Sequence, residues 1–209
     1  MALDEALLEA LPRLGHPVLR FYDWTERAAS FGYFQHFAEI QRLTPLRPLV
    51  RRPTAGGLVP HDADWTYSLA FPTSATWYEL TARESYRRVH EWIQAAFSQL
   101  GLATTLAAGA KSGAGQCFVG YEESDLLWEG NKIAGAAQRR RRDGLLIQGS
   151  IQPPRVGPSR IDWQRAMRAV VEANPGVRWM EFIPDKALQV RAEELAKRKY
   201  SQPEYNQKR

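Results

Sequence analysis

The chain has 209 residues, of which 44% are hydrophobic and 24% are charged, and its formal net charge at pH 7 is +5. This length suffices for one domain with a substantial core, and the composition excludes a disordered or fibrous protein. The sequence has no apolar run of the ~20 residues that a membrane-spanning helix needs, no basic secretory leader and only one cysteine, so we expect a single cytoplasmic domain without disulfides.

The positive charge is concentrated in two places, at positions 139–142 and in the C-terminal segment 191–209. A nucleic acid would suit this charge, but neither segment contains a recognisable nucleic-acid-binding motif. An acidic protein would suit it equally well. We therefore expect a protein partner, with no nucleic acid and no membrane among the partners.

The first part of the chain predicts a short helix followed by strands. Apolar residues at helical spacing, such as Leu3 and Leu7, predict a helix over 2–11, and Pro12 is expected to end it. Aromatic and branched residues at 17–24 favour a strand, and a second strand is expected within 26–35. Gly32 in that segment either allows the close approach of a ligand or of neighbouring backbone, or simply permits core packing.

The segment 51–57, RRPTAGG, combines paired arginines with small residues. Exposed backbone amides beside fixed positive charge suit a carboxylate, a phosphate or a thioester oxygen, and the alternative is an ordinary surface turn. The segment is neither a Walker loop nor a dinucleotide fingerprint, because no GK[ST] follows and the GxGxxG spacing is absent. His61 and Asp62 come next, and a lone histidine at the entry of a strand is usually structural.

The middle of the chain predicts a strand and a long helix. Residues 65–71, WTYSLAF, suit a strand. Thr81 and Glu84 form a capping box before an amphipathic helix, which Gly101 is placed to end. His90 falls on the apolar face of this helix, so we interpret it as a structural histidine that faces the core.

The next part predicts strands with turns at 129–131 and 142–144. The expected strands are 100–108, 125–128, 132–139 and 145–151. A positive charge in the middle of an antiparallel ladder costs stability unless it points at something, so Lys132 is a stronger candidate for a functional residue than the exposed arginines.

Cys117 is the only cysteine, and it lies between the small-residue segment 109–115 and Phe118. A thiol is a useful nucleophile at neutral pH only when a nearby positive charge or base stabilises its thiolate. Lys132 or the arginines could supply that charge. By residue type alone, however, a single cysteine is more often a small buried hydrophobe than a catalyst.

The C-terminal part predicts a linker over 153–158 and two helices. Asp162 is expected to cap the first helix, and the second runs from Ala187 to about Tyr200. The tail 201–209 is expected to be solvated. The sequence has neither CxxC pairs nor an HExxH motif, so we expect no metal site.

Several segments, taken together in their order and spacing, resemble the lipoate-protein ligase and octanoyltransferase family. The resemblance covers nearly the whole chain and includes MALDEALL, PVLRFYDWTERAASFGYFQ with the family's SxGYxQ, RRPTAGGLVPHDADWTYSL with its RRxTGGGxVxHxxDxTYS signature, ESYRRVHEWIQAAFSQLG, NKIAGAAQRR, GLLIQGSI and LAKRKYSQPEYN. Each motif alone is modest evidence, whereas their common order is strong evidence.

This resemblance implies an α+β fold with a mixed, largely antiparallel sheet flanked by helices, as in the catalytic domain shared with biotin-protein ligases. It also implies an acyl chain in a tunnel beneath the Gly-rich loop, with Lys132 at the acyl carbonyl and a catalytic cysteine in a Cys-Phe dipeptide, here Cys117 followed by Phe118. The substrate-binding residues that it implies are Arg51, Arg52, Thr54, Ala55, Gly56, Gly57, His61, Tyr67, Ser68, Gly135 and Ala136.

Three departures from the family pattern qualify what the resemblance implies. Ala55 replaces the first glycine of the family's triple-glycine run, which adds a methyl group and removes backbone freedom, so altered acyl specificity and lost activity both remain open. Because the printed sequence starts with the segment that resembles the family's first helix, we expect no counterpart of the family's leading strand. We also expect no small C-terminal accessory domain of the kind that some ligases have. Residues 1–209 are therefore expected to form one catalytic domain, which favours a transferase over a ligase.

The expected function is cysteine-dependent transfer of an octanoyl, or other medium-chain acyl, group from acyl carrier protein to a lysine of a lipoyl domain or a related acceptor, without a cofactor. One alternative is a lipoate or biotin ligase that uses ATP and Mg²⁺. Another is a non-catalytic protein that binds acyl groups or carriers. Arg139, Arg140, Arg141 and Arg142 are expected either to meet an acidic partner at the pocket mouth or to form a solvated hairpin tip.

Overall fold

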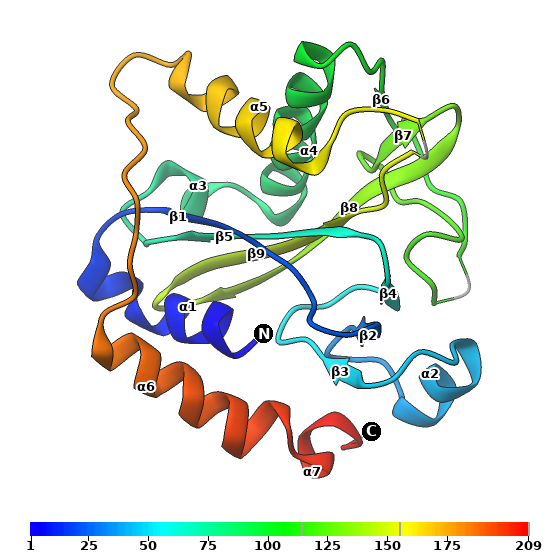
Figure 1. The fold of residues 1–209 in the computed structure, drawn as a ribbon, viewed down its shortest axis with the longest axis vertical. Coiled ribbons are helices and arrows are strands. Elements are labelled where there is room, and N and C mark those ends of the chain that lie inside the picture. The colour runs from blue at the N-terminus through cyan, green and yellow to red at the C-terminus, as the bar shows by residue number, and fades with distance from the viewer. Residues whose placement is uncertain (114, 155, 209) are drawn as a thin grey trace.

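The computed structural model describes residues 1–113, 115–154 and 156–208. Its centre is a six-stranded antiparallel sheet with the strand order β1-β5-β9-β8-β7-β6, and a three-stranded sheet with the order β3-β2-β4 lies beside it (Figure 1). In the smaller sheet, β2 pairs with β3 in parallel and with β4 antiparallel. The predicted α+β class, with a mixed and largely antiparallel sheet, is confirmed.

The strands are β1 (Val18–Tyr22), β2 (Ala28–Phe31), β3 (Leu49–Arg51), β4 (Val59–His61), β5 (Trp65–Phe71), β6 (Thr105–Leu106), β7 (Leu126–Trp128), β8 (Asn131–Arg141) and β9 (Gly144–Ile151). The helices are α1 (Ala2–Leu14), α2 (Phe37–Leu43), α3 (Thr76–Glu79), α4 (Ala82–Gln99), α5 (Arg160–Glu172), α6 (Lys186–Leu195), the π-helical turn η1 (Ala196–Tyr200) that continues α6, and α7 (Pro203–Asn206). Among the described residues, no helix is both long and apolar enough to cross a membrane.

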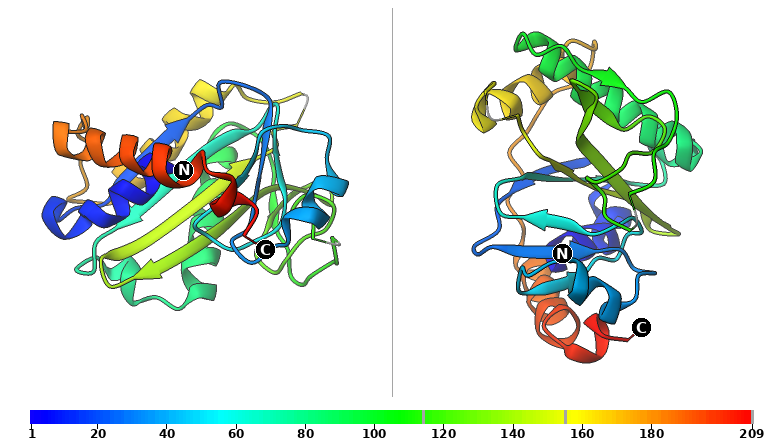
Figure 2. Two further views of the ribbon diagram at one scale, coloured as in Figure 1. Left: turned by 90° about the horizontal axis from the view of Figure 1, so that it is seen from below. Right: turned by 90° about the vertical axis from the view of Figure 1, so that its right-hand side faces the viewer.

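Helices cover both faces of the main sheet. α4 and α5 lie on one face, and α1 and α6 lie on the other, so that the sheet is the middle of three layers (Figures 1 and 2). The smaller sheet and α2 lie to one side of this sandwich, close to the C-terminal end of the chain. This arrangement brings the loop between β3 and β4 toward the central strands.

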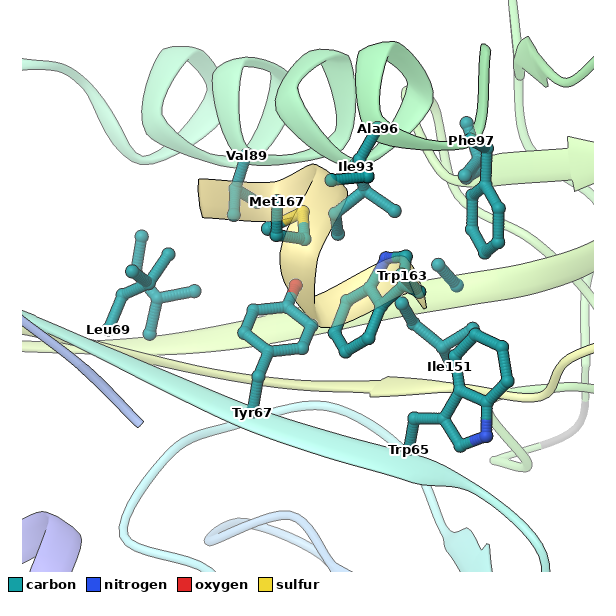
Figure 3. Packing of buried hydrophobic residues seen from close by; sticks show 14 of the residues in the cluster. Trp65, Tyr67, Leu69, Val89, Ile93, Ala96, Phe97, Ile151, Trp163 and Met167 are labelled. Carbon is teal, nitrogen blue, oxygen red and sulfur yellow. The ribbon is translucent and has the colours of Figure 1, made fainter. Parts of the chain in front are cut away.

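The larger core lies between the main sheet and the pair α4 and α5. Trp65, Tyr67 and Leu69 occupy alternate positions of β5 and face this core, in which Trp65 and Tyr67 pack against Trp163 of α5 (Figure 3). Successive side chains of a strand point to opposite faces of its sheet, so Ser68 points instead toward α1. The alternation gives the sheet an apolar face under α4 and a partly polar face under α1.

The first helix is longer than the sequence predicts. α1 continues through Pro12 to Leu14, so the expectation that Pro12 ends the helix is wrong. Pro12 has no N–H to donate, so one backbone hydrogen bond of the helix is lost there. The fully buried Leu11 anchors this turn, and Gly15, with a φ of 71°, closes it by donating its N–H to the Leu11 carbonyl.

Side-chain caps determine where α4 and α5 begin. α4 has the predicted capping box of Thr81 and Glu84. The expectation that Asp162 caps α5 is wrong, because the hydroxyl of Ser159 accepts the Asp162 backbone N–H and α5 therefore begins at Arg160.

Two further predictions differ from the structure. The strand expected at 100–108 is reduced to the two residues of β6. The tail is only partly solvated, because α7 folds back toward β3 and Asn206 Oδ1 accepts the Arg51 backbone N–H at 2.9 Å, while residues such as Lys208 are exposed. The expected linker 153–158 and the small-residue segment 109–115 each include one position, 155 and 114 respectively, that lies outside the described residues.

Candidate active site

Cys117 and Lys132 lie side by side. The Cys117 Sγ atom is 3.3 Å from the Lys132 Nζ atom, and the Phe118 ring centroid is 5.5 Å from the same ammonium group. Cys117 is half-buried in the segment between β6 and β7, whereas the Lys132 side chain is only 4% exposed. The cysteine and the lysine that the sequence singles out thus form one pair.

An irregularity in the sheet and a glycine make room for Lys132. Leu127 of β7 pairs with Lys132, but the preceding Leu126 pairs with Ala134, so the register between β7 and β8 shifts at this point. A Cβ atom on Gly135 would lie 2.6 Å from Lys132 Cε and 2.8 Å from its Nζ. Gly135 therefore leaves the space that the lysine side chain occupies.

Asp125 is a third member of this site that the sequence analysis missed. Its Oδ2 atom lies 2.6 Å from Lys132 Nζ and accepts the Glu122 backbone N–H at 2.6 Å, and its Oδ1 atom accepts the Tyr86 hydroxyl. The carboxylate is completely buried. The only signal in the sequence is an acid directly before the apolar strand β7, which is weak because its partners come from two other segments.

The electrostatics of this group keep Lys132 charged. Burial by itself lowers the pKa of Lys132, but the Cys117 sulfur and the Asp125 carboxylate outweigh it, and the pKa lies above its ordinary value. Lys132 is consequently a fixed cation at neutral pH. It can stabilise a thiolate or an oxyanion, but it cannot accept a proton.

His90 lies behind Asp125 and has the structural role that the sequence predicts. Its side chain is completely buried, its Nδ1–H donates to the Tyr86 carbonyl at 2.9 Å, and its ring packs against the Tyr86 ring. Burial lowers the pKa of His90 to about 4. The imidazole is therefore neutral at physiological pH.

The loop between β3 and β4 packs directly on the cysteine segment. A Cβ atom on Gly57 would lie 2.7 Å from the Gly115 carbonyl oxygen and 3.1 Å from the Cys117 nitrogen. The Leu58 N–H donates to the Gly115 carbonyl, and the Cys117 N–H donates to the Leu58 carbonyl, both at 2.9 Å. Gly57 therefore permits a close backbone contact that fixes Cys117 to this loop.

Gly32 also permits a close approach, and its neighbour is backbone. A Cβ atom there would lie 1.9 Å from the Gly56 carbonyl oxygen. Of the three explanations left open for Gly32, the approach of neighbouring backbone is the one that the structure supports.

The segment 51–57 is not an ordinary surface turn, because Arg51, Arg52 and Thr54 are buried and only Gly56 is exposed. Arg52 donates to the Ala55 and Gly57 carbonyls at 3.1 and 2.7 Å and to the Ser30 hydroxyl at 2.9 Å. Burial lowers the pKa of Arg52 to about 10, which leaves it charged at neutral pH. The buried guanidinium group of Arg52 thus stabilises the loop at 55–57 through its backbone carbonyls.

Arg51 faces away from Arg52 and holds the C-terminal segment. Its Nη1 atom donates to the Tyr33 and Gln35 carbonyls at 2.8 and 2.7 Å, and its Nη2 atom donates to the Asn206 carbonyl at 2.9 Å. In this structure Arg51 joins three segments of backbone.

A small cavity of about 30 Å³ lies beneath the loop and next to the cysteine. Six of the residues that the sequence analysis names line it, namely Cys117, Arg52, Gly56, His61, Gly135 and Ala136. The other lining residues are Met1, Tyr22, Ser30, Val59, Thr66, Ala137, Gln148, Gly149 and Ser150. The alternation of polar residues in β9, with Gln148 and Ser150 on one face, is the signal that could have identified part of this wall.

The remaining predicted residues do not line the cavity as far as the structure describes it. Thr54 donates to Gln148 Oε1 at 2.9 Å, and Ala55 is held through its carbonyl. Tyr67 points into the core beside Trp163, and Ser68 donates to Asp4 Oδ1 at 2.7 Å.

One wall of the cavity contains a chain of buried hydrogen bonds from Ser30 through His61 to Asp64. The Ser30 Oγ and His61 Nε2 atoms are 2.6 Å apart, and His61 Nδ1 is 2.9 Å from Asp64 Oδ2. Trp24 stacks on the His61 ring with 4.0 Å between centroids. Burial lowers the pKa of His61 despite the neighbouring carboxylate, so His61 is a neutral ring that accepts from Ser30 and donates to Asp64.

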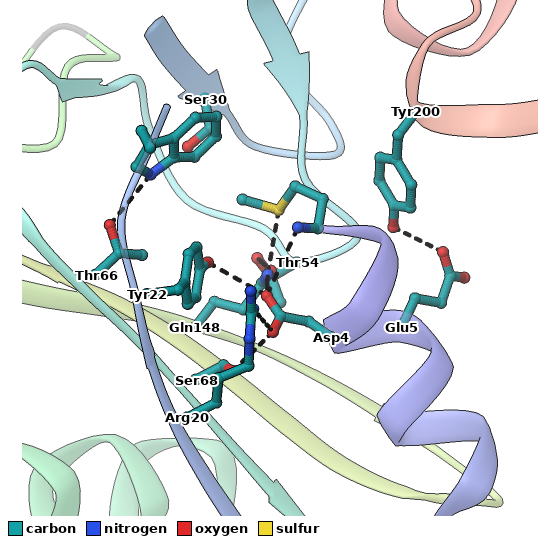
Figure 4. Close-up of polar contacts among 12 residues, drawn as sticks. Asp4, Glu5, Arg20, Tyr22, Ser30, Thr54, Thr66, Ser68, Gln148 and Tyr200 are labelled. Carbon is teal, nitrogen blue, oxygen red and sulfur yellow. Dashed lines mark hydrogen bonds and ion pairs between the residues drawn. The ribbon is translucent and has the colours of Figure 1, made fainter. Parts of the chain in front are cut away.

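A second buried polar cluster lies below the first, around Asp4 of α1. Arg20 and Gln148 each donate to this carboxylate at 2.7 Å, and Tyr22 donates at 3.2 Å (Figure 4). Asp4 was not identified from the sequence. Its side chain therefore joins α1, β1 and β9 by hydrogen bonds beneath the cavity.

The four arginines of the β8–β9 hairpin lie at different places. Arg139 donates to the Pro53 carbonyl at 2.8 Å and therefore lies beside the loop. Arg140 donates to the Tyr78 and Leu80 carbonyls, and Arg141 donates to Glu5. The Arg142 side chain is 95% exposed at the tip. The predicted contact of these four arginines with an acidic partner protein stays a prediction.

The chain matches the model of the lipoyl protein ligase A/B catalytic domain over residues 1–152. It is 38% identical over 160 residues to the octanoyltransferase LipM of Carboxydothermus hydrogenoformans, with 72% of this chain and 59% of the relative covered. It is 34% identical over 169 residues to LipM of Bacillus subtilis, with the same shares covered. The chain thus spans about 60% of the length of these relatives.

Solved structures share the fold at lower sequence identity. A putative lipoate protein ligase from T. acidophilum with bound lipoic acid superposes with a TM-score of 0.76 at 19% identity, over 100% of this chain and 95% of the other. A lipoate-protein ligase A bound with ATP gives the same TM-score and identity, over 99% of this chain and 94% of the other. These likenesses concern the fold alone.

Proposed function

Because the chain belongs to the lipoyl protein ligase A/B catalytic-domain family, we propose that it is a cysteine-dependent octanoyltransferase, which moves a medium-chain acyl group from acyl carrier protein to a lysine of a lipoyl domain. The observation that carries this proposal is the distance of 3.3 Å between the Cys117 thiol and the Lys132 ammonium group. A buried cation beside a half-buried thiol is the environment that a nucleophilic cysteine requires.

The first half of the reaction forms a thioester on Cys117. The Cys117 thiolate attacks the carbonyl carbon of the octanoyl carrier, the new C–S bond forms, and the carrier thiol leaves with its electron pair and a proton from solvent. Lys132 stabilises the negative charge that develops on the carbonyl oxygen. Because its charge is fixed, it is available at the start of the attack without a proton transfer.

The second half of the reaction transfers the acyl group to the acceptor. The neutral amine of the acceptor lysine attacks the same carbonyl carbon, the C–N bond forms, the C–S bond to Cys117 breaks, and the amine loses a proton to solvent. The departing thiolate lies again beside Lys132. In this proposal no cofactor is needed, because the incoming thioester is already activated.

The acyl chain is proposed to enter the cavity beneath the loop at 55–57. The cavity of about 30 Å³ holds only one or two water molecules, so an octanoyl chain requires the loop or the side chains on the opposite wall to move. If the loop moves, the hydrogen bonds from Arg52 to the Ala55 and Gly57 carbonyls must lengthen or break. The extra methyl group of Ala55 lies in the segment that must adjust.

An ATP-dependent lipoate ligase is the second candidate, and the fold shared with the ATP-bound ligase favours it. Such an enzyme needs Lys132 but not Cys117. ATP with Mg²⁺ would then protect the chain against thermal unfolding, whereas a transferase would show no such protection. A protein that only binds acyl groups would neither form an adduct on Cys117 nor transfer one.

The test is to incubate residues 1–209 with octanoyl acyl carrier protein and a lipoyl domain, with and without ATP. The proposal predicts octanoylation of the lipoyl domain at the same rate in both cases. Octanoylation that occurs only with ATP and free octanoate would support the ligase. The use of residues 1–209 also tests the proposal that they form one catalytic domain.

A further inference from the structure

A wide basic groove lies at the C-terminal end of the chain. It has a volume of about 760 Å³, and the residues that matter for its charge and shape are Lys197, Arg198, Lys199, Glu204, Tyr205 and Lys208. Lys199 is paired with Glu5 at 2.5 Å, whereas Lys197, Arg198 and Lys208 are exposed. The groove therefore presents concentrated positive charge to solvent, and it accounts for part of the C-terminal basic excess in the sequence.

Hydrogen bonds of two consecutive arginines connect this groove to the loop that covers the cavity. Asn206, which follows the groove residue Tyr205, gives both its carbonyl and its Oδ1 atom to Arg51. The next residue, Arg52, holds the loop carbonyls of Ala55 and Gly57. Arg51 is completely buried, so the two consecutive arginines connect the groove to the loop by hydrogen bonds.

The groove also lies close to the entrance of the cysteine site. Lys208 Nζ is 3.7 Å from the centroid of the Tyr33 ring, and Gln35 Nε2 donates to the Gly115 carbonyl at 2.9 Å. The groove edge and the segment that carries Cys117 are therefore linked through the side chains of two residues, Tyr33 and Gln35, that lie two positions apart in the chain. Phe34, between these two contacts, is 64% exposed.

The geometry points to this groove as the docking surface for the acyl carrier protein, an inference that rests on the proposed function. A carrier delivers its thioester on a long arm attached through a phosphodiester, so both the arm and an acidic carrier surface are attracted to a cationic groove. An acceptor domain instead presents a lysine, whose charge the groove repels. The exposed Phe34 ring supplies an apolar contact on the route from the groove to Cys117.

The hairpin arginines fit this role less well. Lys132 and Arg141 are nine residues apart on β8, which places the hairpin tip about 30 Å from the lysine. Arg140 and Arg141 are also engaged with groups of this chain. The groove instead presents three exposed cations, Lys197, Arg198 and Lys208, to solvent.

The test reverses two exposed charges of the groove in the variant Lys197→Glu with Arg198→Glu. A matched control, Arg178→Glu with Lys186→Glu, makes the same change in net charge at exposed positions before and at the start of α6. Binding of holo acyl carrier protein is measured by fluorescence anisotropy from low to physiological salt. Transfer is measured with octanoyl carrier, with a small octanoyl thioester and with varied lipoyl domain.

The groove variant is expected to bind the carrier at least about tenfold more weakly at low salt and to lose most of the salt dependence, while the control variant binds as the parent does. Turnover of the small thioester should be unchanged in both variants. Unchanged carrier binding in the groove variant, or a raised KM for the lipoyl domain alone, would overturn the inference. If the parent binds carrier through the groove but transfers nothing, the proposed function fails and the docking surface stands.

Discussion

The ion pair between Asp125 and Lys132 is buried, with 2.6 Å between Oδ2 and Nζ, and the lysine side chain is 4% exposed. The same ammonium group lies 3.3 Å from the Cys117 sulfur. Asp125 therefore both positions the lysine and competes with the thiolate for its charge. Lys132 and Asp125 should affect the reactivity of Cys117 in opposite directions.

Replacing Lys132 with alanine is expected to lower kcat/KM for transfer by about 10²–10³, because one buried donor to the developing oxyanion is lost. The reaction of Cys117 with iodoacetamide should shift to higher pH, since the thiolate loses its nearest cation. Lys111→Ala, an exposed lysine six residues before the cysteine, serves as the control and should match the parent. Unchanged thiol reactivity and turnover in the Lys132 variant would remove the lysine from the site.

Replacing Asp125 with asparagine is expected to shift iodoacetamide reactivity to lower pH, because the thiolate no longer shares Lys132 with a carboxylate. Transfer should nevertheless slow by about tenfold in kcat, or about 1.4 kcal/mol, with little change in KM, since the lysine is less well oriented. Thermal unfolding of the same variant checks that the fold persists. A pH profile of thiol reactivity identical to that of the parent would show that Asp125 has only a structural role.

Much of this site could be predicted from the sequence, and the part that was missed has a common cause. Cys117 and Lys132 were identified because their residue types and the family resemblance both point to them. Asp125 was not, because its partners Lys132 and Tyr86 belong to two other segments, and Tyr86 lies 39 residues earlier in the chain. Likewise, the tail was expected to be solvated because its partner Arg51 is 155 residues away from Asn206. Local patterns give the strands and the capping box of α4, but they contain no information about such distant polar contacts.

Stability should fall in mild acid because of His90. The pKa of this buried ring is about 4, whereas the unfolded chain binds a proton at its histidines below about pH 6.5. The neutral His90 ring therefore makes its full contribution to the free energy of unfolding above about pH 6.5. This contribution decreases as the pH falls toward 4, and the free energy of unfolding is lower by about 2 kcal/mol at pH 5. Urea unfolding at pH 7.5 and pH 5 measures this decrease in the parent and in His90→Gln.

The glutamine variant is expected to be less stable than the parent at pH 7.5 but to show the smaller difference between the two pH values. His61, whose pKa burial also lowers, contributes to both proteins and cancels in the comparison. Equal pH slopes would contradict a neutral, buried His90.

Neutralising the hairpin tip with Arg141→Gln and Arg142→Gln is expected to leave the KM for octanoyl carrier protein unchanged, because the tip lies about 30 Å along β8 from Lys132. The loss of the Arg141 contact with Glu5 should lower the unfolding temperature slightly. Steady-state kinetics over a range of salt concentrations provide the measurement. A raised KM with a flatter salt dependence would instead support the hairpin as the partner-binding surface.

The covalent intermediate on Cys117 is the central claim, and intact-mass measurement tests it most directly. The chain is mixed with octanoyl acyl carrier protein in the absence of ATP and of any acceptor, and the adduct is located by peptide mapping. The account predicts one octanoyl group on Cys117, its loss on addition of a lipoyl domain, and no adduct in Cys117→Ser, since an alcohol without a strong base is too weakly ionised to attack. An unmodified Cys117 in a protein that still octanoylates the lipoyl domain, or full activity of Cys117→Ser, would contradict it.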